Sequence, residues 1–156
     1  MKFHKRIEKV FFVISACSFM LAFYHIASAE SLAFRTAKGQ YIVAEGGGGG
    51  AVNADRVEVG PWEIFEVIDV GDGKVALKTD NGRYLVAEGG GGGAINADRV
   101  EIGPWEKFTI IPLRGNKICL KTSTGHFVVA EGGGGGAVNG NRDRCGEWET
   151  FEKIKQ

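Results

Sequence analysis

Apolar and polar residues alternate in short runs along most of this chain, and turn residues separate the runs. Between positions 73 and 115 the runs are KVALKT, RYLVAE, AINADRV and EKFTIIP, separated by DNG, by five consecutive glycines and by EIGPW. Short alternating runs between glycine, proline and asparagine are typical of β-strands joined by turns. No stretch of residues 30–156 keeps the 3.6-residue period of an amphipathic helix. The pattern predicts an all-β domain.

The same set of runs occurs three times. VAEGGGGGAVNADR at 43–56 returns as VAEGGGGGAINADR at 86–99 and as VAEGGGGGAVNGNR at 129–142. Three units of four strands predict twelve strands in a closed β-trefoil with pseudo-threefold symmetry, because a propeller of four-stranded blades typically needs four or more blades. We expect a single domain over 30–156, whose repeats have the approximate bounds 30–72, 73–115 and 116–156.

The first 29 residues do not share this pattern. A basic start, MKFHKR, precedes the apolar stretch VFFVISACSFMLAFY, and ASA stands before Glu30. A basic segment, an apolar segment too short for a comfortable membrane span and small residues before a cut are typical of a secretory signal peptide. We predict a signal peptide over 1–29 and a secreted or periplasmic protein. The alternatives are an uncleaved anchor and a lipid attached at Cys17.

The charge balance bears on the partners of the protein. The chain has 19 Lys and Arg and 19 Asp and Glu, and the predicted signal peptide removes more basic than acidic residues. The remaining domain is slightly acidic, a balance that gives no electrostatic footprint for nucleic acid. We expect no nucleic-acid partner, no membrane association after cleavage, no cofactor and a monomer.

Two cysteines remain after the predicted cleavage, Cys119 and Cys145, both in the third unit. They stand where the other units have apolar residues, so they can be buried thiols that act as small hydrophobes. Export also allows a disulfide, which requires a Cα separation that a sequence does not supply. Both alternatives stay open at this point.

Comparison of the three units separates core positions from surface positions. One phenylalanine per unit precedes a run of alternating apolar residues. We assign these phenylalanines and five further apolar residues to the core: Phe65, Phe108, Phe151, Leu77, Leu120, Ile42, Leu85 and Val128. A tryptophan lies three residues before each of these phenylalanines, an offset that places two side chains on opposite faces of an extended strand. We therefore predict three surface tryptophans: Trp62, Trp105 and Trp148. A flat, rigid indole can stack on a sugar ring, and the alternative role is to cap the end of the barrel.

Two sets of glutamates are candidates for the polar part of such a site. The first set directly follows the tryptophans and consists of Glu63, Glu106 and Glu149. Alternation places this set in phase with the core phenylalanines, so its alternative role is a structural carboxylate that accepts backbone N–H groups. The second set opens the glycine runs and consists of Glu45, Glu88 and Glu131. A carboxylate there can accept two sugar hydroxyls, and the alternative is a turn residue on a solvated rim.

The glycine runs have two competing interpretations. Five residues without side chains can leave room beside the tryptophan for a sugar ring, or they can let the loop pack tightly on an adjacent strand. A phosphate site is excluded because no Lys-Ser/Thr pair and no helix follow. The asparagines after the runs (Asn53, Asn96 and Asn139) can bind hydroxyls, whereas a calcium ion usually requires more carboxylates than this segment offers. We predict no metal site.

The residues also carry a resemblance to known families. GRYLVAEGGGGGAINADR followed by FTI resembles the repeat of fascin-like β-trefoils, and the added GPWE.F is similar to bacterial fascin-like and family 92 carbohydrate-binding modules. The resemblance covers nearly all of residues 30–156 in all three units. It implies one sugar site per unit, built around a tryptophan and a glutamate, with β-glucans as the candidate ligand class.

The repetition itself separates the functional classes. An enzyme usually concentrates one set of catalytic groups in one cleft, whereas every acidic and aromatic candidate here occurs three times. We therefore predict no catalytic residues and a non-catalytic, lectin-like, multivalent protein with up to three glycan sites. The alternative is a protein-binding trefoil, either a filament cross-linker of the fascin type or a secreted inhibitor. Because the third unit departs most from the repeat, we expect units one and two to bind alike and unit three to differ.

Overall fold

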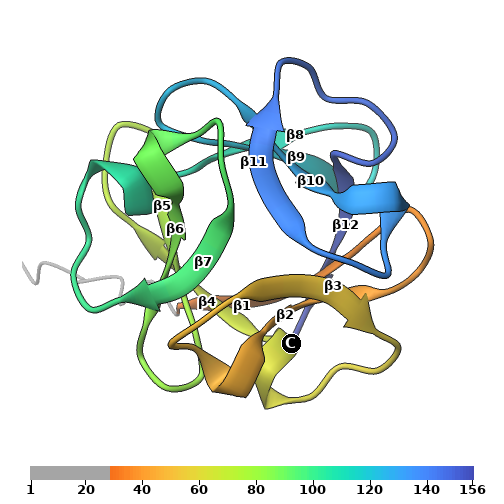
Figure 1. Ribbon diagram of the computed structural model, residues 1–156, viewed down its shortest axis with the longest axis horizontal. Coiled ribbons are helices and arrows are strands. Elements are labelled where there is room, and N and C mark those ends of the chain that lie inside the picture. The colour runs from red at the N-terminus through yellow and green to blue at the C-terminus, as the bar shows by residue number, and fades with distance from the viewer. Residues whose placement is uncertain (1–28) are drawn as a thin grey trace, which may run out of the picture.

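The computed structural model describes residues 29–156, and the predicted signal peptide lies outside this part apart from Ala29. Each of the three units contributes four strands, which confirms the predicted β-trefoil (Figure 1). The strands are β1 (Glu30–Arg35), β2 (Tyr41–Ala44), β3 (Val52–Arg56), β4 (Phe65–Asp69), β5 (Val75–Lys78), β6 (Tyr84–Ala87), β7 (Ile95–Arg99), β8 (Thr109–Pro112), β9 (Lys117–Lys121), β10 (Phe127–Ala130), β11 (Val138–Arg142) and β12 (Thr150–Lys155).

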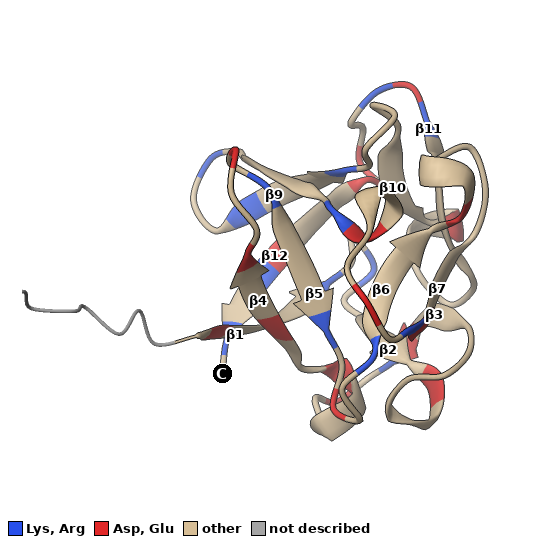
Figure 2. Ribbon diagram, turned by 90° about the vertical axis from the view of Figure 1, so that its left-hand side faces the viewer, with Lys and Arg blue, Asp and Glu red and all other residues tan. Residues whose placement is uncertain are grey.

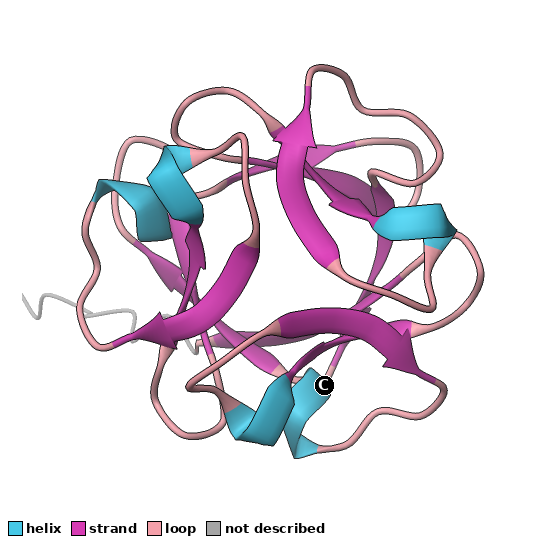
Figure 3. Cartoon of the chain, viewed as in Figure 1, coloured by secondary structure: helices cyan, strands magenta, loops and turns pink. Residues whose placement is uncertain are grey.

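Short 3-10 turns accompany the strands, and the sequence pattern did not predict them. They are η1 (Glu45–Gly47), η2 (Pro61–Glu63), η3 (Glu88–Gly90), η4 (Pro104–Glu106) and η5 (Glu131–Gly133). Figure 3 shows them at the periphery of the molecule, away from the central axis. Within residues 29–156 no helix is long and apolar enough to cross a membrane.

The first and last strands of each unit form a barrel. Antiparallel pairing joins β4–β1, β1–β12, β12–β9 and β9–β8, and on the other side β4–β5. The ring closes between β5 and the start of β8, where Val75 and Phe108 exchange backbone hydrogen bonds of 2.9 and 2.8 Å. Closure leaves no barrel strand with an unpaired edge that could add a foreign strand.

The middle strands of each unit form three antiparallel hairpins, β2–β3, β6–β7 and β10–β11. The strand register of each hairpin shifts after the aromatic residue that opens it, which is Tyr41, Tyr84 or Phe127. Such bulges bend a strand. Viewed along the pseudo-threefold axis, β3, β7 and β11 surround the centre of the molecule (Figure 1).

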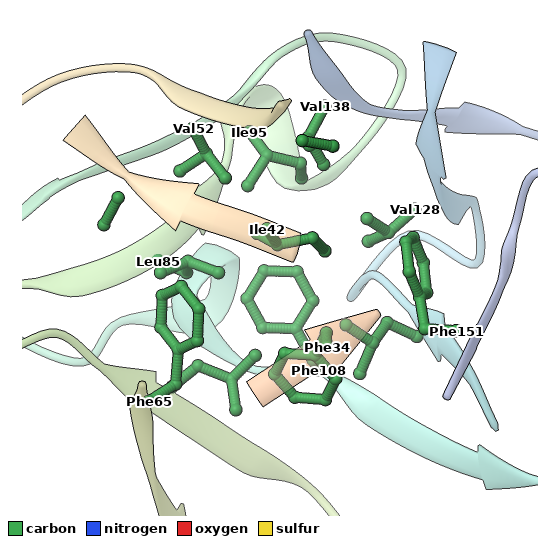
Figure 4. Close-up of a cluster of buried hydrophobic side chains, with 14 of the residues drawn as sticks. Phe34, Ile42, Val52, Phe65, Leu85, Ile95, Phe108, Val128, Val138 and Phe151 are labelled. Atoms are coloured by element: carbon green, nitrogen blue, oxygen red, sulfur yellow. The ribbon is translucent and has the colours of Figure 1, made fainter. Parts of the chain in front are cut away.

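The core lies inside the barrel and beneath the hairpins. Figure 4 shows Phe34, Phe65, Phe108 and Phe151 gathered among aliphatic side chains from all three units. Every residue assigned to the core from the sequence is at most 4 % exposed, which confirms that assignment. Truncation of a buried phenylalanine typically costs about 3–5 kcal/mol of stability, so this cluster is the main apolar contribution to the fold.

The glycine runs join the units to one another. The Gly49 N–H donates to the Ala97 carbonyl at 2.6 Å, and the Ala97 N–H donates to the Gly50 carbonyl at 2.8 Å. The same pair of bonds links Gly92 and Gly93 to Gly140, and Gly135 and Gly136 to Ala54. Each run therefore pairs with the third strand of the next unit, and the third unit pairs back to the first.

Only glycine fits the third position of each run. Gly48 has φ +118°, and a Cβ on it would lie 2.5 Å from both Thr79 Oγ1 and Asn81 Oδ1 in the following unit. Gly91 meets Thr122 and Thr124 at 2.5 Å, and Gly134 meets Gln40 and Thr36 at 2.6 and 2.7 Å. Of the two interpretations of the runs, tight packing is therefore the one observed at their third residue.

Cys119 in β9 and Cys145 in the loop after β11 form a disulfide, with the Cα atoms 6.3 Å apart. This pairing decides between the two alternatives that the sequence left open. It fastens the loop that leads to Trp148 to a barrel strand of the same unit.

We predict that Gly48→Ala destabilises the protein strongly, whereas Gly50→Ala does not. The first change places a side chain at positive φ and against Thr79, with a backbone cost of about 1–3 kcal/mol before the clash is added. Gly50 has no positive φ and nothing within 4 Å of an added Cβ. Urea unfolding of both variants measures the difference, and equal losses would contradict the junction described here.

Candidate functional site

Three large aromatic side chains lie on the surface at equivalent positions. Trp62, Trp105 and Trp148 are 42 %, 44 % and 45 % exposed, which confirms their predicted surface position. The local reason differs from the predicted one, because Trp62 and Trp105 sit in the 3-10 turns η2 and η4 and not in an extended strand. In the third unit Glu147 replaces the proline and Trp148 sits in a turn.

The second glycine of each run holds the tryptophan in place. A Cβ on Gly47 would lie 3.1 Å from Trp62 Nε1, closer than most real Cβ contacts. Gly90 and Gly133 stand in the same relation to Cδ1 of Trp105 and Trp148, again at 3.1 Å. The edge of each indole therefore rests on a backbone without side chains, and a large part of the ring remains open to solvent.

The glutamates that follow the tryptophans lie beneath the surface. Glu63 and Glu106 are 5 % exposed and Glu149 is 7 % exposed. In the first unit Oε2 accepts the Gly60 N–H at 2.8 Å, while Oε1 lies 3.8 Å from Arg56 Nε. The other two units repeat both contacts. Burial and backbone contacts favour the structural alternative for this set, whose part in sugar binding remains a prediction.

The glutamates at the glycine runs are more accessible. The side chains of Glu45 and Glu88 are 31 % exposed and that of Glu131 is 32 % exposed. In the first unit Glu45 accepts Asn53 Nδ2 at 3.0 Å and Arg56 Nη2 at 2.7 Å. The candidate asparagines thus orient these carboxylates. Within residues 29–156 no three His, Cys, Asp or Glu side chains form a group that can hold a metal ion.

One arginine per unit connects the two glutamate sets. Arg56 donates to Glu45 and to Asp55, at 2.7 and 2.6 Å, and points its Nε toward Glu63. Arg99 and Arg142 repeat the arrangement, with Asn141 replacing the aspartate in the third unit. These arginines were not among the predicted site residues, although their repeated position after NAD, NAD and NGN could have indicated them. Figure 2 shows acidic and basic residues interspersed over one side of the molecule.

Each unit offers a surface for stacking together with groups for hydrogen bonding. Each unit presents a partly exposed indole beside hydrogen-bond acceptors and an arginine whose remaining surface can donate. The partly exposed ion pairs of the arginines with Glu45, Glu88 and Glu131 contribute only about 0–1 kcal/mol to stability, so their main effect is to fix the orientation of the polar groups. A neutral, polyhydroxylated ring has a complementary surface, because its C–H face is apolar and its hydroxyls both donate and accept.

A barrel capped by three hairpins, with one such surface arrangement in every unit, defines a threefold repeated β-trefoil. The chain belongs to the FRG1-like domain family, whose model matches residues 50–154. This finding agrees with the predicted resemblance to fascin-like β-trefoils. No curated protein matches the chain.

Solved structures of low sequence identity share the fold. A designed 3-fold symmetric protein, ThreeFoil, superimposes with a TM-score of 0.73 at 15% identity, over 81% of this chain and 99% of that one. SeviL bound to asialo-GM1 saccharide has a TM-score of 0.65 at 10% identity, over 82% and 98%. The exo-β-1,3-galactanase 1,3Gal43A from Clostridium thermocellum has a TM-score of 0.71 at 12% identity, over 85% of this chain but only 31% of the galactanase.

We predict that Glu63→Ala lowers stability by about 1–3 kcal/mol, because it leaves the Gly60 N–H without its acceptor in a partly buried turn. Glu58→Ala, at an exposed position of the loop that leads to the same turn, is the matched control and should change stability little. Thermal unfolding compares the two. If Glu63→Ala melted like the control, the carboxylate would not be structural.

Proposed function

We propose that this protein is a secreted, non-catalytic carbohydrate-binding protein with up to three glycan sites and with β-glucans as its candidate ligands. The observation that carries the proposal is the set of three exposed tryptophans, each held against a glycine backbone at an equivalent place. SeviL, a protein of the same fold, has been solved bound to the asialo-GM1 saccharide, which supports carbohydrate binding in general.

The chemistry of each site suits a sugar ring. The C–H face of the ring stacks on the indole, and the rigidity of the indole keeps the entropic cost of binding low. Glu45, oriented by Asn53 and Arg56, can accept hydroxyl protons at the edge of the site. Glu63 acts from below by holding the turn that carries Trp62.

The threefold arrangement supports binding over catalysis. The same aromatic and acidic groups recur in each unit, and the two glutamates of a unit are both engaged by one arginine. A glycosidase needs two carboxyl groups on opposite sides of the bond to be cleaved, with different protonation states. In each unit the arginine already engages both carboxylates, which favours a structural role for the pair over this one.

We predict that Trp62→Ala, Trp105→Ala and Trp148→Ala each remove one binding event, at a cost of roughly 1–3 kcal/mol in local affinity. The side chains are partly exposed, so the melting temperature should change little. Calorimetric titration with β-glucan oligosaccharides measures affinity and stoichiometry. Leu113→Ala is the control, since Leu113 is 42 % exposed and lies outside the tryptophan sites. A large drop in melting temperature with unchanged stoichiometry would identify the tryptophans as structural.

We also predict that a soluble β-glucan polymer binds much more tightly than its short oligosaccharides. Once one site holds a polymer, the others experience a high local concentration of the same chain. Concentrated protein should also aggregate the polymer, because sites that point in three directions can bridge separate chains. Light scattering and affinity electrophoresis measure both effects. Equal affinity for polymer and oligosaccharide, with one ligand per protein, would contradict multivalent binding.

Export is part of the proposal. The disulfide between Cys119 and Cys145 supports it, because disulfides persist in oxidising compartments. We expect mass spectrometry of the exported protein to identify Glu30 as the first residue. A lipid on Cys17, or an intact Met1 in a membrane fraction, would contradict cleavage after Ala29.

A further inference from the structure

We propose that each tryptophan site is completed by the turn of the following unit, and that this turn decides which sugars the site accepts. The inference rests on the proposed function, because it assigns specificity to the same three sites. The turns concerned join the first and second strands of a unit. They read AKGQ (37–40), DNGR (80–83) and STGH (123–126).

The geometry places each turn beside the tryptophan of the preceding unit. A point at the Cβ position of Gly47 is 3.1 Å from Trp62 Nε1 and 3.5 Å from Asp80 Oδ2. The equivalent point at Gly90 is 3.1 Å from Trp105 Cδ1 and 3.0 Å from Ser123 Oγ. Asp80 and Ser123 are both exposed. Each side chain therefore reaches the rim of a site whose tryptophan belongs to another unit.

The third site follows the same rule with different residues. The Cβ position of Gly133 is 3.1 Å from Trp148 Cδ1 and 3.7 Å from Lys38 Cγ. Position 37, which corresponds to Asp80 and Ser123, is an alanine. The rim beside Trp148 therefore has no acceptor at this position, and the side chain of Lys38 passes beside it.

Backbone hydrogen bonds fix the turns in the same place while their side chains vary. The N–H groups of Asn81, Thr124 and Lys38 donate to the carbonyls of Gly47, Gly90 and Gly133 at 3.1, 3.1 and 3.0 Å. Side chains add to this in two of the sites, where Asn81 Nδ2 donates to Gly48 O and Thr124 Oγ1 donates to Gly90 O. The backbone bond forms whichever residue stands at the variable position. In the second site Ser123 Oγ also donates to Gly90 O at 3.3 Å, so Asp80→Ser is the exchange that tests chemistry without a change of placement.

Two surface hollows mark the junction between a tryptophan turn and the next turn. One, of about 330 Å³, is lined by Pro61 and Ile64 on one side and by Thr79 and Asp80 on the other. A second, of about 310 Å³, has the equivalent residues Glu147, Thr150, Thr36 and Ala37. A second sugar residue that extends from the indole toward the hollow would contact the variable position.

The three turns offer different chemistry to a ligand. Asp80 can accept hydroxyls and repels a carboxylate, so the Trp62 site should favour neutral sugars over uronic acids. Ser123 is uncharged, and its hydroxyl both donates and accepts. Lys38 attracts a carboxylate, so the Trp148 site should accept uronic acids best. Comparison of the three units by sequence predicted that the first two sites bind alike. If each site includes the turn of the following unit, all three sites differ in the groups that they offer to a sugar.

The test uses the three tryptophans of the chain as separate reporters, since each supplies one indole N–H resonance. Single tryptophan-to-phenylalanine variants assign the three signals. Titration with methyl β-glucoside, methyl β-glucuronide and neutral β-glucan trisaccharides then gives a dissociation constant at each tryptophan. The decisive variants are the reciprocal exchanges Asp80→Ser and Ser123→Asp.

We expect Asp80→Ser to raise the glucuronide-to-glucoside affinity ratio at Trp62 about threefold, the factor for unit charges several ångströms apart in water. Trp105 should not respond, although Asp80 and Trp105 belong to the same unit. Ser123→Asp should lower the ratio at Trp105 by a similar factor and leave Trp62 unchanged. High salt should weaken both effects.

The possible outcomes distinguish failure of the composite site from failure of the proposed sugar-binding function. If no indole signal of the unaltered protein responds to any saccharide, the proposed function fails and the inference fails with it. If the signals respond but the exchanges change nothing, or change the tryptophan of their own unit, sugar binding stands and the composite site is wrong. Circular dichroism melting of both variants shows whether the fold is retained.

Discussion

The structure depends on backbone pairing between the glycine run of one unit and the third strand of the next. Two hydrogen bonds form at each junction, and the third junction returns to the first unit. A hairpin buries too little apolar surface to be stable alone, so the three hairpins need this mutual support over the barrel. The pairing brings two backbones and the polar turn of the next unit together, which leaves no room for a Cβ at Gly48, Gly91 or Gly134.

The same constraint builds the candidate site. The glycine run ends a strand, turns beneath an indole and then joins the neighbouring unit, so one segment fixes the place of the tryptophan and of the next turn. The arginine of each unit ties the start of this segment to the tryptophan turn through Glu45 and Glu63. A rigid aromatic surface is thereby obtained in a loop region, where side chains are usually mobile.

Alternation and turn residues were sufficient to predict the strands, the threefold repeat and the core positions of Phe65, Phe108 and Phe151, because these follow from local periodicity. The exposure of Trp62 was also predicted, but from strand geometry that does not apply in a 3-10 turn. Arg56 was missed although the repeat marks its position, whereas the role of Asp80 could not be predicted because it arises from the approach of one unit to the next. Asn81 and Gly48, which are 33 positions apart, meet only where the second unit packs on the glycine run of the first.

The two ends of the described chain lie side by side. The Gln156 N–H donates to the Ser31 carbonyl at 3.0 Å, and Lys155 pairs with Glu30 at 3.1 Å. Every unit also meets its neighbours through equivalent contacts. A short linker between these ends, with new ends opened in an exposed loop, would give a circular permutant in which any unit comes first. The order of the units is therefore a property of the chain and not of the folded body, which is a ring without a structural beginning.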